Sequence, residues 1–250
     1  MENRPVWLDE YANILNEIRN RLEQIPVVEE ATFRYAIIRL FARATLSMCE
    51  IYTLMHNGYP EGAFSLSRQI YEAIVLMDYL TKHKDDEAMI ERYFDDIEIT
   101  KIQIRIEQEK YARYDIEISA TDELNKYIKK YPNLCNRNNR FRDYWWIDKD
   151  CTFSKLSQQT NFTKNFMYTE TCNVTHMSLF NSTVYLANNK NGILIGKTYC
   201  SIDKVGRYSM LWFCMAMDLF SKSHDIDLND LISKGKDLVT KIRENPTFFE

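Results

Sequence analysis

Residues 58–80 read GYPEGAFSLSRQIYEAIVLMDYL, and this stretch decides the fold. On a helical wheel of about 100° per residue its apolar side chains cover both sides, which is typical of a buried helix rather than a surface helix. Arg68 and Glu72 lie one helical turn apart within it. Because burying either charge alone costs several kcal/mol, we expect the two to lie inside the protein or in a cleft, with partners.

The composition around this stretch favours long helices. Only six Gly and five Pro interrupt 250 residues, whereas folds built from many short strands need more turn residues. Hydrophobic residues make up 45% of the chain and charged residues 27%, which is ordinary for a globular protein. The net charge of −4 gives no general attraction to nucleic acid, so such binding would need a local basic patch.

Apolar spacing, Pro and Gly predict the order of the helices. We expect helices over about residues 6–24, 28–56, 58–83, 84–117, 121–131, 162–188, 203–223 and 227–244. Asp85, Asp86 and Glu87 are expected in the first turn of the fourth helix, a solvated outer arm, and Thr121 is expected to cap the fifth. Residues 132–160 are predicted to be irregular, and residues 193–200 to form a short strand or an extended loop.

Together these elements predict an all-α fold. We expect a single domain over residues 1–250, a helical bundle of six to eight helices with one irregular insert. Its core would cover residues 28–190, with an N-terminal helix and a C-terminal helix pair added.

Several functional classes are disfavoured by the sequence. The four His and six Cys are widely separated, so we predict no metal site, and the nucleotide-binding glycine motifs are absent, so we predict no cofactor. No apolar run approaches the ~20 residues of a spanning helix. We therefore expect a cytoplasmic protein with reduced thiols and no membrane association.

The predicted helix over residues 162–188 carries His176 in a stripe of small polar side chains. The stripe consists of Asn165, Thr169, Cys172, Asn173 and Thr183. A His on such a face is often a satisfied core residue. If it meets Arg68 and Glu72, however, the three are candidate catalytic residues, an acid–base imidazole beside a cation that holds an anion. Tyr71, Thr169, Cys172 and Asn173 are then the candidate ligand-binding residues. Alternatively, the ion pair only fixes the register of packed helices.

Residues 126–149 combine seven basic side chains and two acidic ones with several aromatic rings. Cations interleaved with aromatics suit phosphate contact and base stacking, so this segment is a candidate RNA-binding surface. The candidate residues there are Arg137, Arg140, Arg142 and Trp145. The alternative is an irregular loop that Trp145 and Trp146 pin to the core, with the Arg side chains outside.

The spacing G-x3-G-A-x2-L-x-R-x3-E, from Gly58 to Glu72, followed about a hundred residues later by His176, resembles a widespread bacterial family of all-helical domains of unknown function. The resemblance covers about residues 30–190 and implies the fold class and the site, but no reaction. A more distant likeness is to the HEPN superfamily of helical ribonucleases and nucleotide-binding domains. Its usual signature, an Arg followed four to six residues later by His, is missing here; His83, for example, follows Arg68 by fifteen residues.

Three functions follow as hypotheses. The first is a metal-independent, HEPN-like, RNA-cleaving or phosphodiester-acting protein of a bacterial defence or toxin module. In it His176 would be the acid or base, Arg68 the phosphate clamp and Glu72 an orienting residue. The second is a non-enzymatic binding module for a small anionic ligand or a partner protein. The third is a purely structural role for the three side chains, with function in oligomerisation. The HEPN likeness also implies RNA as a partner and a homodimer.

Overall fold

Helix α3 (Pro60–Lys82) contains most of the apolar stretch of residues 58–80, and both of its faces are largely buried. The computed structural model describes residues 4–26, 32–109, 120–136, 140–162, 166–175 and 201–247. Gly58 adopts a positive φ of 78° and Pro60 takes the first helical position. Gly adopts the positive φ of this turn without strain, and the fixed φ of Pro suits the start of a helix. The predicted end of one helix at residues 57–58 and the start of the next at Pro60 are therefore confirmed.

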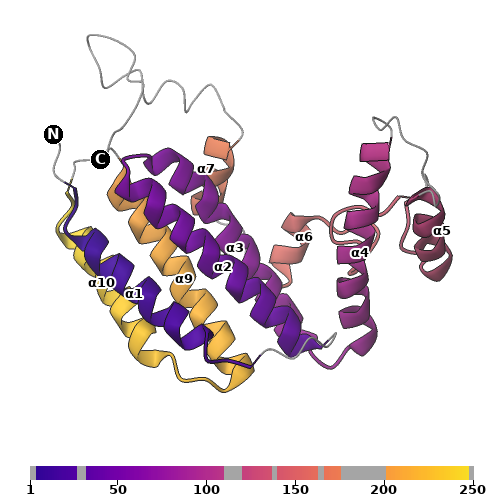
Figure 1. Cartoon of the computed structure of the whole chain (residues 1–250), viewed down its shortest axis with the longest axis horizontal. Coiled ribbons are helices and arrows are strands. Elements are labelled where there is room, and N and C mark those ends of the chain that lie inside the picture. The colour runs from indigo at the N-terminus through magenta and orange to yellow at the C-terminus, as the bar shows by residue number, and fades with distance from the viewer. Residues whose placement is uncertain are drawn as a thin grey trace, which may run out of the picture.

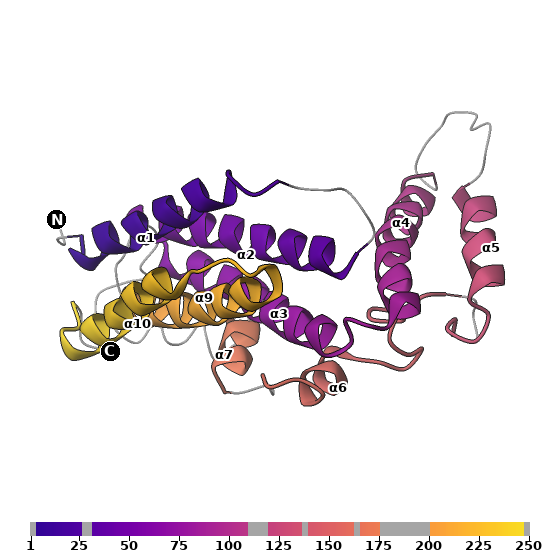
Figure 2. The same cartoon turned by 90° about the horizontal axis from the view of Figure 1, so that it is seen from below.

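Five long helices form the main bundle (Figures 1 and 2). They are α1 (Trp7–Leu22), α2 (Phe33–His56), α3, α9 (Ile202–His224) and α10 (Asn229–Glu244). Helices α2, α3 and α9 pack against one another, and α1 and α10 cover them on one side. All regular structure in the described residues is helical, in nine helices, which confirms the predicted all-α fold.

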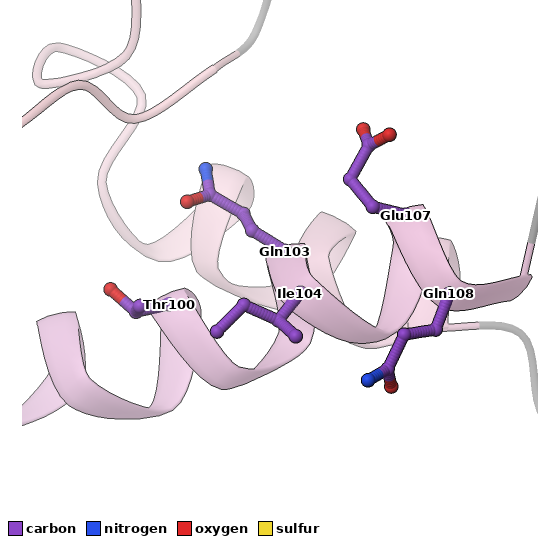
Figure 3. Close-up of a pocket in the computed structure, with 5 residues that line it drawn as sticks. All are labelled: Thr100, Gln103, Ile104, Glu107 and Gln108. Atoms are coloured by element: carbon purple, nitrogen blue, oxygen red, sulfur yellow. The ribbon is translucent and has the colours of Figure 1, made fainter. Parts of the chain in front are cut away.

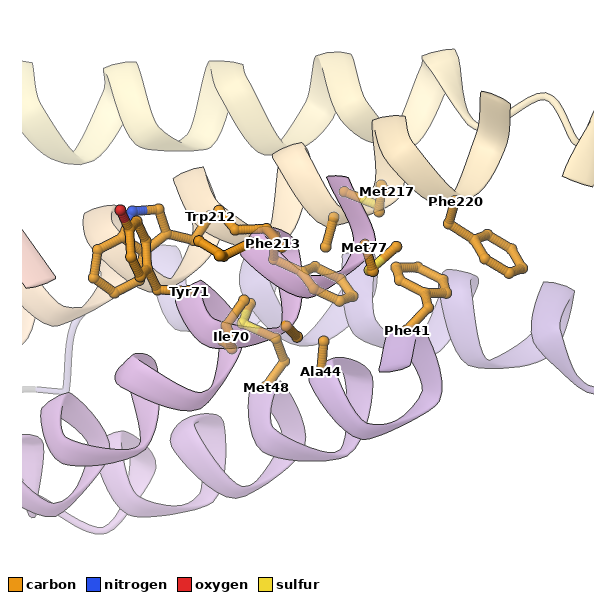
Figure 4. Close-up of a cluster of buried hydrophobic side chains, with 14 of the residues drawn as sticks. Phe41, Ala44, Met48, Ile70, Tyr71, Met77, Trp212, Phe213, Met217 and Phe220 are labelled. Carbon is orange, nitrogen blue, oxygen red and sulfur yellow. The ribbon is translucent and has the colours of Figure 1, made fainter. Parts of the chain in front are cut away.

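The hydrophobic core lies between α2, α3 and α9 (Figure 4). Phe41 of α2 stacks on Phe220 of α9 with ring centroids 4.3 Å apart, and Phe213 lies 5.8 Å from Phe41 on the other side. Met48 and Met77 fill the space beside these rings and are fully buried. The core is thus dense in aromatic and thioether side chains, which bury much apolar area for each residue.

The predicted ends of α1, α3, α9 and α10 lie within two residues of the observed ones, but the predicted start of α2 was wrong. Thr32 has an extended backbone (φ −110°, ψ 157°), and its hydroxyl accepts a hydrogen bond from the Tyr35 amide over 3.3 Å. This is N-cap geometry, so α2 begins at Phe33 and not at residue 28. Residues 27–31 lie outside the described part of the chain.

A buried carboxylate ties three distant segments together at one end of the bundle. Asp203, in the first turn of α9, accepts from Trp7 Nε1 over 2.8 Å and from the Thr247 amide over 2.7 Å. The Trp7 ring lies directly on Gly206, where an added Cβ would come within 2.4 Å of it. Helix α1 and the segment after α10 are therefore fixed to the start of α9.

Helices α4 (Glu87–Glu109) and α5 (Ala120–Lys130) form an arm beside the bundle (Figure 2). Only four α4 residues are buried, which agrees with the predicted outer arm. Two details of the prediction were wrong. Asp86 precedes α4 and accepts from the Met89 amide over 2.9 Å, so of the three predicted carboxylates only Glu87 lies in the first turn. Thr121 lies inside α5, which begins one residue earlier, and so does not cap it.

Two tryptophans attach the arm to the bundle. Trp145 donates from Nε1 to Asp96 of α4 over 2.6 Å. The Trp146 ring contacts Tyr79 of α3 and Tyr93 of α4 edge-on, at 5.9 and 5.1 Å between centroids. Both tryptophans are buried, so the part of the insert that contains them is packed between the arm and the bundle.

Two short helices complete the described chain. Helix α6 (Phe153–Gln158), capped by the Thr152 hydroxyl, lies in the insert that was predicted to be irregular throughout. Helix α7 (Phe166–Thr175) lies in the predicted 162–188 helix and packs on α3. Residues 176–200 are outside the described residues, and with them the predicted strand at 193–200. None of the described helices combines the length and the apolarity needed to cross a bilayer.

Candidate functional site

The Arg68–Glu72 pair predicted from the sequence is formed on α3. Arg68 Nε donates to Glu72 Oε1 over 2.7 Å, and each side chain is 28% exposed. Burial alone would lower the pKa of Arg68, but the hydrogen bond and charge of Glu72 outweigh it, so the pKa is raised above its ordinary value. The guanidinium therefore stays charged, at a position between the core and the solvent.

Helix α7 brings a third group to this pair. Tyr168 donates its hydroxyl to Glu72 Oε1 over 3.2 Å, and the Arg68 guanidinium lies over the Tyr168 ring at 5.5 Å from its centroid. Burial, followed by the charge of Glu72, raises the pKa of Tyr168. The thiol of Cys172 lies close enough to affect the pKa of both Tyr168 and Arg68. A cation, an acid, a phenol and a thiol thus meet between α3 and α7.

Other residues of α3 position α7. The Tyr71 hydroxyl donates to the Phe162 carbonyl over 2.7 Å. Two turns further from Arg68, the buried carboxylate of Asp78 accepts from the Asn161 backbone amide over 2.8 Å and from its side-chain amide over 3.0 Å. These bonds hold the chain just before α7 on α3. Because they fix where α7 starts, they help to set Tyr168 against Glu72.

A second ion pair lies one helical turn away along α3. Lys204 of α9 contacts Glu170 of α7 over 3.0 Å, with the Lys204 side chain 29% exposed. The Lys204 ammonium lies over the Phe64 ring at 5.7 Å and the Tyr208 ring at 5.9 Å. Phe64 precedes Arg68 by four residues, so the two cations share one side of α3. Arg68, Glu72, Tyr168, Glu170 and Lys204 are called the Arg68 site below.

One oxygen of the Arg68 site is not satisfied. Glu170 Oε1 accepts from Lys204, whereas Glu170 Oε2 is buried and has no hydrogen-bond partner among the residues that the structure describes. Buried polar atoms are usually paired, because leaving one unpaired costs about 1–3 kcal/mol. The site therefore contains a buried acceptor that lacks a donor among the described residues.

The predicted ligand-binding residues have different positions. Cys172 lies beside Tyr168, as described above. Tyr71 is buried and its hydroxyl is used to hold Phe162, so it acts as a structural support; burial raises its pKa to about 12. Thr169 is exposed on α7. The Asn173 side chain and His176 lie outside what the structure describes, so whether His176 meets Arg68 stays a prediction.

The predicted RNA-contact residues also divide. Arg140 and Arg142 are exposed, as a phosphate contact requires. Arg137 lies outside the described residues. Trp145 is fully buried, packed on Phe141 at 4.5 Å between centroids and bonded to Asp96, so its ring offers no face to a nucleobase. For Trp145 the stacking role is therefore corrected to the alternative, an anchor in the core.

Sequence reasoning missed Tyr168, Glu170 and Lys204. Tyr168, Cys172 and His176 recur at intervals of four residues, which is a helical signal and was available. The pairing of Glu170 with Lys204, in contrast, joins two helices that are separated by residues outside the described chain. No local pattern announces such a contact.

The remaining His residues and cavities lie elsewhere. His56 contacts Arg4, His83 packs on Tyr79, and His224 stacks on Phe220. No group of three metal-ligating side chains converges within the described ranges. A shallow hollow of about 440 Å³ lies along α4, beside Ile104 and Gln103 (Figure 3), and two further cavities border α1.

The comparisons with known proteins identify a family but no activity. The sequence model of a family of unknown function (DUF5677) matches residues 34–193, which include α3, α7 and the Arg68–Glu72 pair. No curated protein and no solved structure matches the chain. Since the matched region covers well over half of the 250 residues, the chain belongs to the DUF5677 family.

Proposed function

We propose that the Arg68 site binds a small anionic ligand of the nucleotide class and that the protein is a helical binding module. The observation that supports this most is the half-buried Arg68 guanidinium, held by Glu72 and lying over the Tyr168 ring. A cation fixed in this way recognises phosphate or carboxylate with little loss of side-chain freedom.

The other groups of the site narrow the ligand class. Lys204 adds a second cation on the same side of α3. The unpartnered Glu170 Oε2 favours a ligand that also carries a hydrogen-bond donor. A nucleotide has both, because its phosphate is anionic and its ribose and base carry hydroxyl and amino donors. A simple inorganic anion would satisfy the cations only.

Thermal shift measurements test this proposal. Adenosine monophosphate should raise the melting temperature of the parent protein by mass action, whereas adenosine, which lacks the phosphate, should raise it much less. Arg68→Ala should abolish the shift. Arg43→Ala is the matched control, because Arg43 of α2 donates to Gln69 of α3, next to Arg68, but is not part of the Arg68 site. An equal shift in the Arg68→Ala protein, or none in the parent, would refute the proposal.

A second candidate is the HEPN-like, metal-independent cleavage of RNA expected from the sequence. It is favoured by the four-residue spacing of Tyr168, Cys172 and His176 in the sequence, since the first two of these lie beside Arg68. In this hypothesis His176 is the general acid or base and Arg68 stabilises the transition-state phosphate. Folded His176→Ala and Arg68→Ala proteins should lose cleavage of single-stranded RNA. Cleavage that is undiminished in both variants would remove this candidate.

The finer predictions from the sequence are kept as parts of the proposal. They are a cytoplasmic location, a role in a defence or toxin module, a homodimer, and RNA or a protein as partner. Light scattering at several protein concentrations measures the oligomeric state, and a mass of about 30 kDa throughout would contradict the homodimer.

A further inference from the structure

A cavity of about 880 Å³ lies far from the Arg68 site, where α1 ends, α2 begins and the chain turns from α9 to α10. Its lining includes His224, which is sixteen residues beyond Tyr208 on α9, or roughly 24 Å along the helix axis. Ligand sites in proteins commonly have volumes of about 300–1,000 Å³. The cavity thus has the size of a small-molecule site and is independent of the proposed function.

The two smaller cavities have simpler explanations. The one of about 340 Å³ between α1 and α10 is crossed by ion pairs of Lys234 with Glu17 and of Lys241 with Glu10, so it is a seam between paired helices. The hollow on α4 runs along one exposed helix side (Figure 3). No basic side chain is found in the described lining of the hollow on α4, and both lysines of the seam between α1 and α10 are already paired with carboxylates.

The lining of the large cavity is amphipathic. Phe33, Ile38 and Ile226 supply apolar surface, while Arg34 and His224 supply polar groups. Tyr35 also lines it and is fixed by stacking on Phe94 of α4, with centroids 5.8 Å apart and planes within 6°. An apolar wall with a few oriented polar groups is the usual composition of a ligand site.

Arg34 is the charged side chain among the described residues of this lining. It contacts Asp225 over 3.1 Å, but both side chains are mostly exposed, at 63% and 81%. Exposed ion pairs contribute only about 0–1 kcal/mol. An external anion can therefore take the place of Asp225 on the Arg34 guanidinium with little loss of stability.

His224 adds a polar group without a charge. Its Nδ1 lies 2.8 Å from the Ser223 hydroxyl, and its ring stacks on Phe220 with centroids 4.4 Å apart. Burial lowers the pKa of His224, and the cation of Arg34 acts in the same direction while Asp225 opposes it. The lowered pKa favours the neutral imidazole, so the described residues of the lining carry one positive charge, that of Arg34, which matches a monoanion better than a phosphate dianion.

We infer that this cavity binds a carboxylate with an apolar body, whose anionic head pairs with Arg34 and whose body contacts Phe33, Ile38 and Ile226. The head replaces Asp225 on the guanidinium. The neutral His224 supplies a further hydrogen bond, and the apolar wall supplies affinity through burial of the hydrocarbon.

The test is calorimetric titration of the full chain with decanoate and with decanol, which share the apolar body and differ in charge. Decanoate should bind the parent protein at least tenfold more tightly than decanol does. Arg34→Gln should weaken decanoate binding about tenfold and leave decanol binding unchanged. Arg39→Gln is the matched control, because Arg39 lies over the same Tyr35 ring at 5.6 Å and is not part of the lining.

Circular dichroism first establishes that the variants are folded, which the exposure of Arg34 leads us to expect. Three results would overturn the inference. They are the absence of decanoate binding to the parent, equal binding of decanoate and decanol, and an equal loss of decanoate binding in the Arg34→Gln and Arg39→Gln proteins.

Discussion

Tyr168 donates its hydroxyl to Glu72 across 96 residues of sequence, and the same ring lies under the Arg68 guanidinium. One side chain of α7 thereby contacts both members of an ion pair on α3. The ion pair is therefore also held by a second helix, although two residues four apart can pair within one helix without such a contact.

Tyr168→Phe separates the two contacts, because it removes the hydroxyl and keeps the ring. We expect a loss of about 0.5–1.5 kcal/mol in the free energy of unfolding, the usual contribution of one hydrogen bond, measured by urea denaturation. In a double-mutant cycle with Glu72→Gln the two losses should be less than additive. Strict additivity would show that the bond contributes nothing.

The segment before α7 depends on Asp78. Asp78→Ala leaves the Asn161 amides without their acceptor and removes the partner of Lys82. We expect a loss of about 2–4 kcal/mol and faster hydrogen exchange at residues 159–162. Asp85→Ala, at an exposed position, is the control and should change neither quantity. Unchanged exchange in the Asp78→Ala protein would contradict the positioning role.

Replacing Gly by Ala should have opposite effects on stability at two positions, Gly206 and Gly62. Gly206→Ala should destabilise the protein by about 1–3 kcal/mol, because the added Cβ would come within 2.4 Å of the rigid Trp7 ring. Gly62→Ala should be neutral or stabilise it by up to about 1 kcal/mol, since the nearest atom is a Leu54 methyl at 3.4 Å and Ala is the better helix former. Melting curves of the two variants give the comparison, and a stable Gly206→Ala protein would contradict the packing of α1 on α9.

Asp96 makes the stability of the arm depend on pH. Burial raises the pKa of this carboxyl to about 6, against an ordinary value of 3.8. The folded state therefore binds the proton more tightly than the unfolded state does, so this residue's contribution to stability is present below about pH 4. It is lost as the pH rises through about 6.

Asp96→Asn removes this dependence and keeps an acceptor for Trp145. At pH 7 the variant should exceed the parent by roughly 1–3 kcal/mol in the free energy of unfolding, and at pH 4 the difference should be close to zero. Urea denaturation at both pH values measures it. A difference that is the same at pH 4 and pH 7 would contradict the raised pKa.

The sequence predicted those parts of the fold that follow from local pattern. Apolar spacing and Pro60 placed α3, and the same reasoning placed α1, α9 and α10 within two residues at either end. It failed at Thr32 and in the insert. At Thr32 the chain forms an N-cap where a turn of helix was expected. In the insert, six residues form α6, which is stabilised by the Thr152 cap and by packing on α3. Such short elements are decided by tertiary contacts.

The candidate site was predictable to the same extent. Arg68 and Glu72 are four residues apart, so their contact follows from the helix itself. The approach of Tyr168, and of Glu170 with Lys204, depends on how α7 and α9 pack against α3, which no window of sequence contains. Trp145 shows the converse error, since its basic neighbours suggested a surface role while its own side chain is buried.

The central claim is that Arg68 receives the anionic group of a ligand, and NMR of the arginine Nε–H groups tests it most directly. The Arg68 signal, assigned by its loss in Arg68→Lys, should shift and saturate on titration with adenosine monophosphate and should stay in place with adenosine. The Arg43 signal should not move in either titration. An Arg68 signal that is unchanged at saturating adenosine monophosphate, or that moves equally with adenosine, would contradict the account.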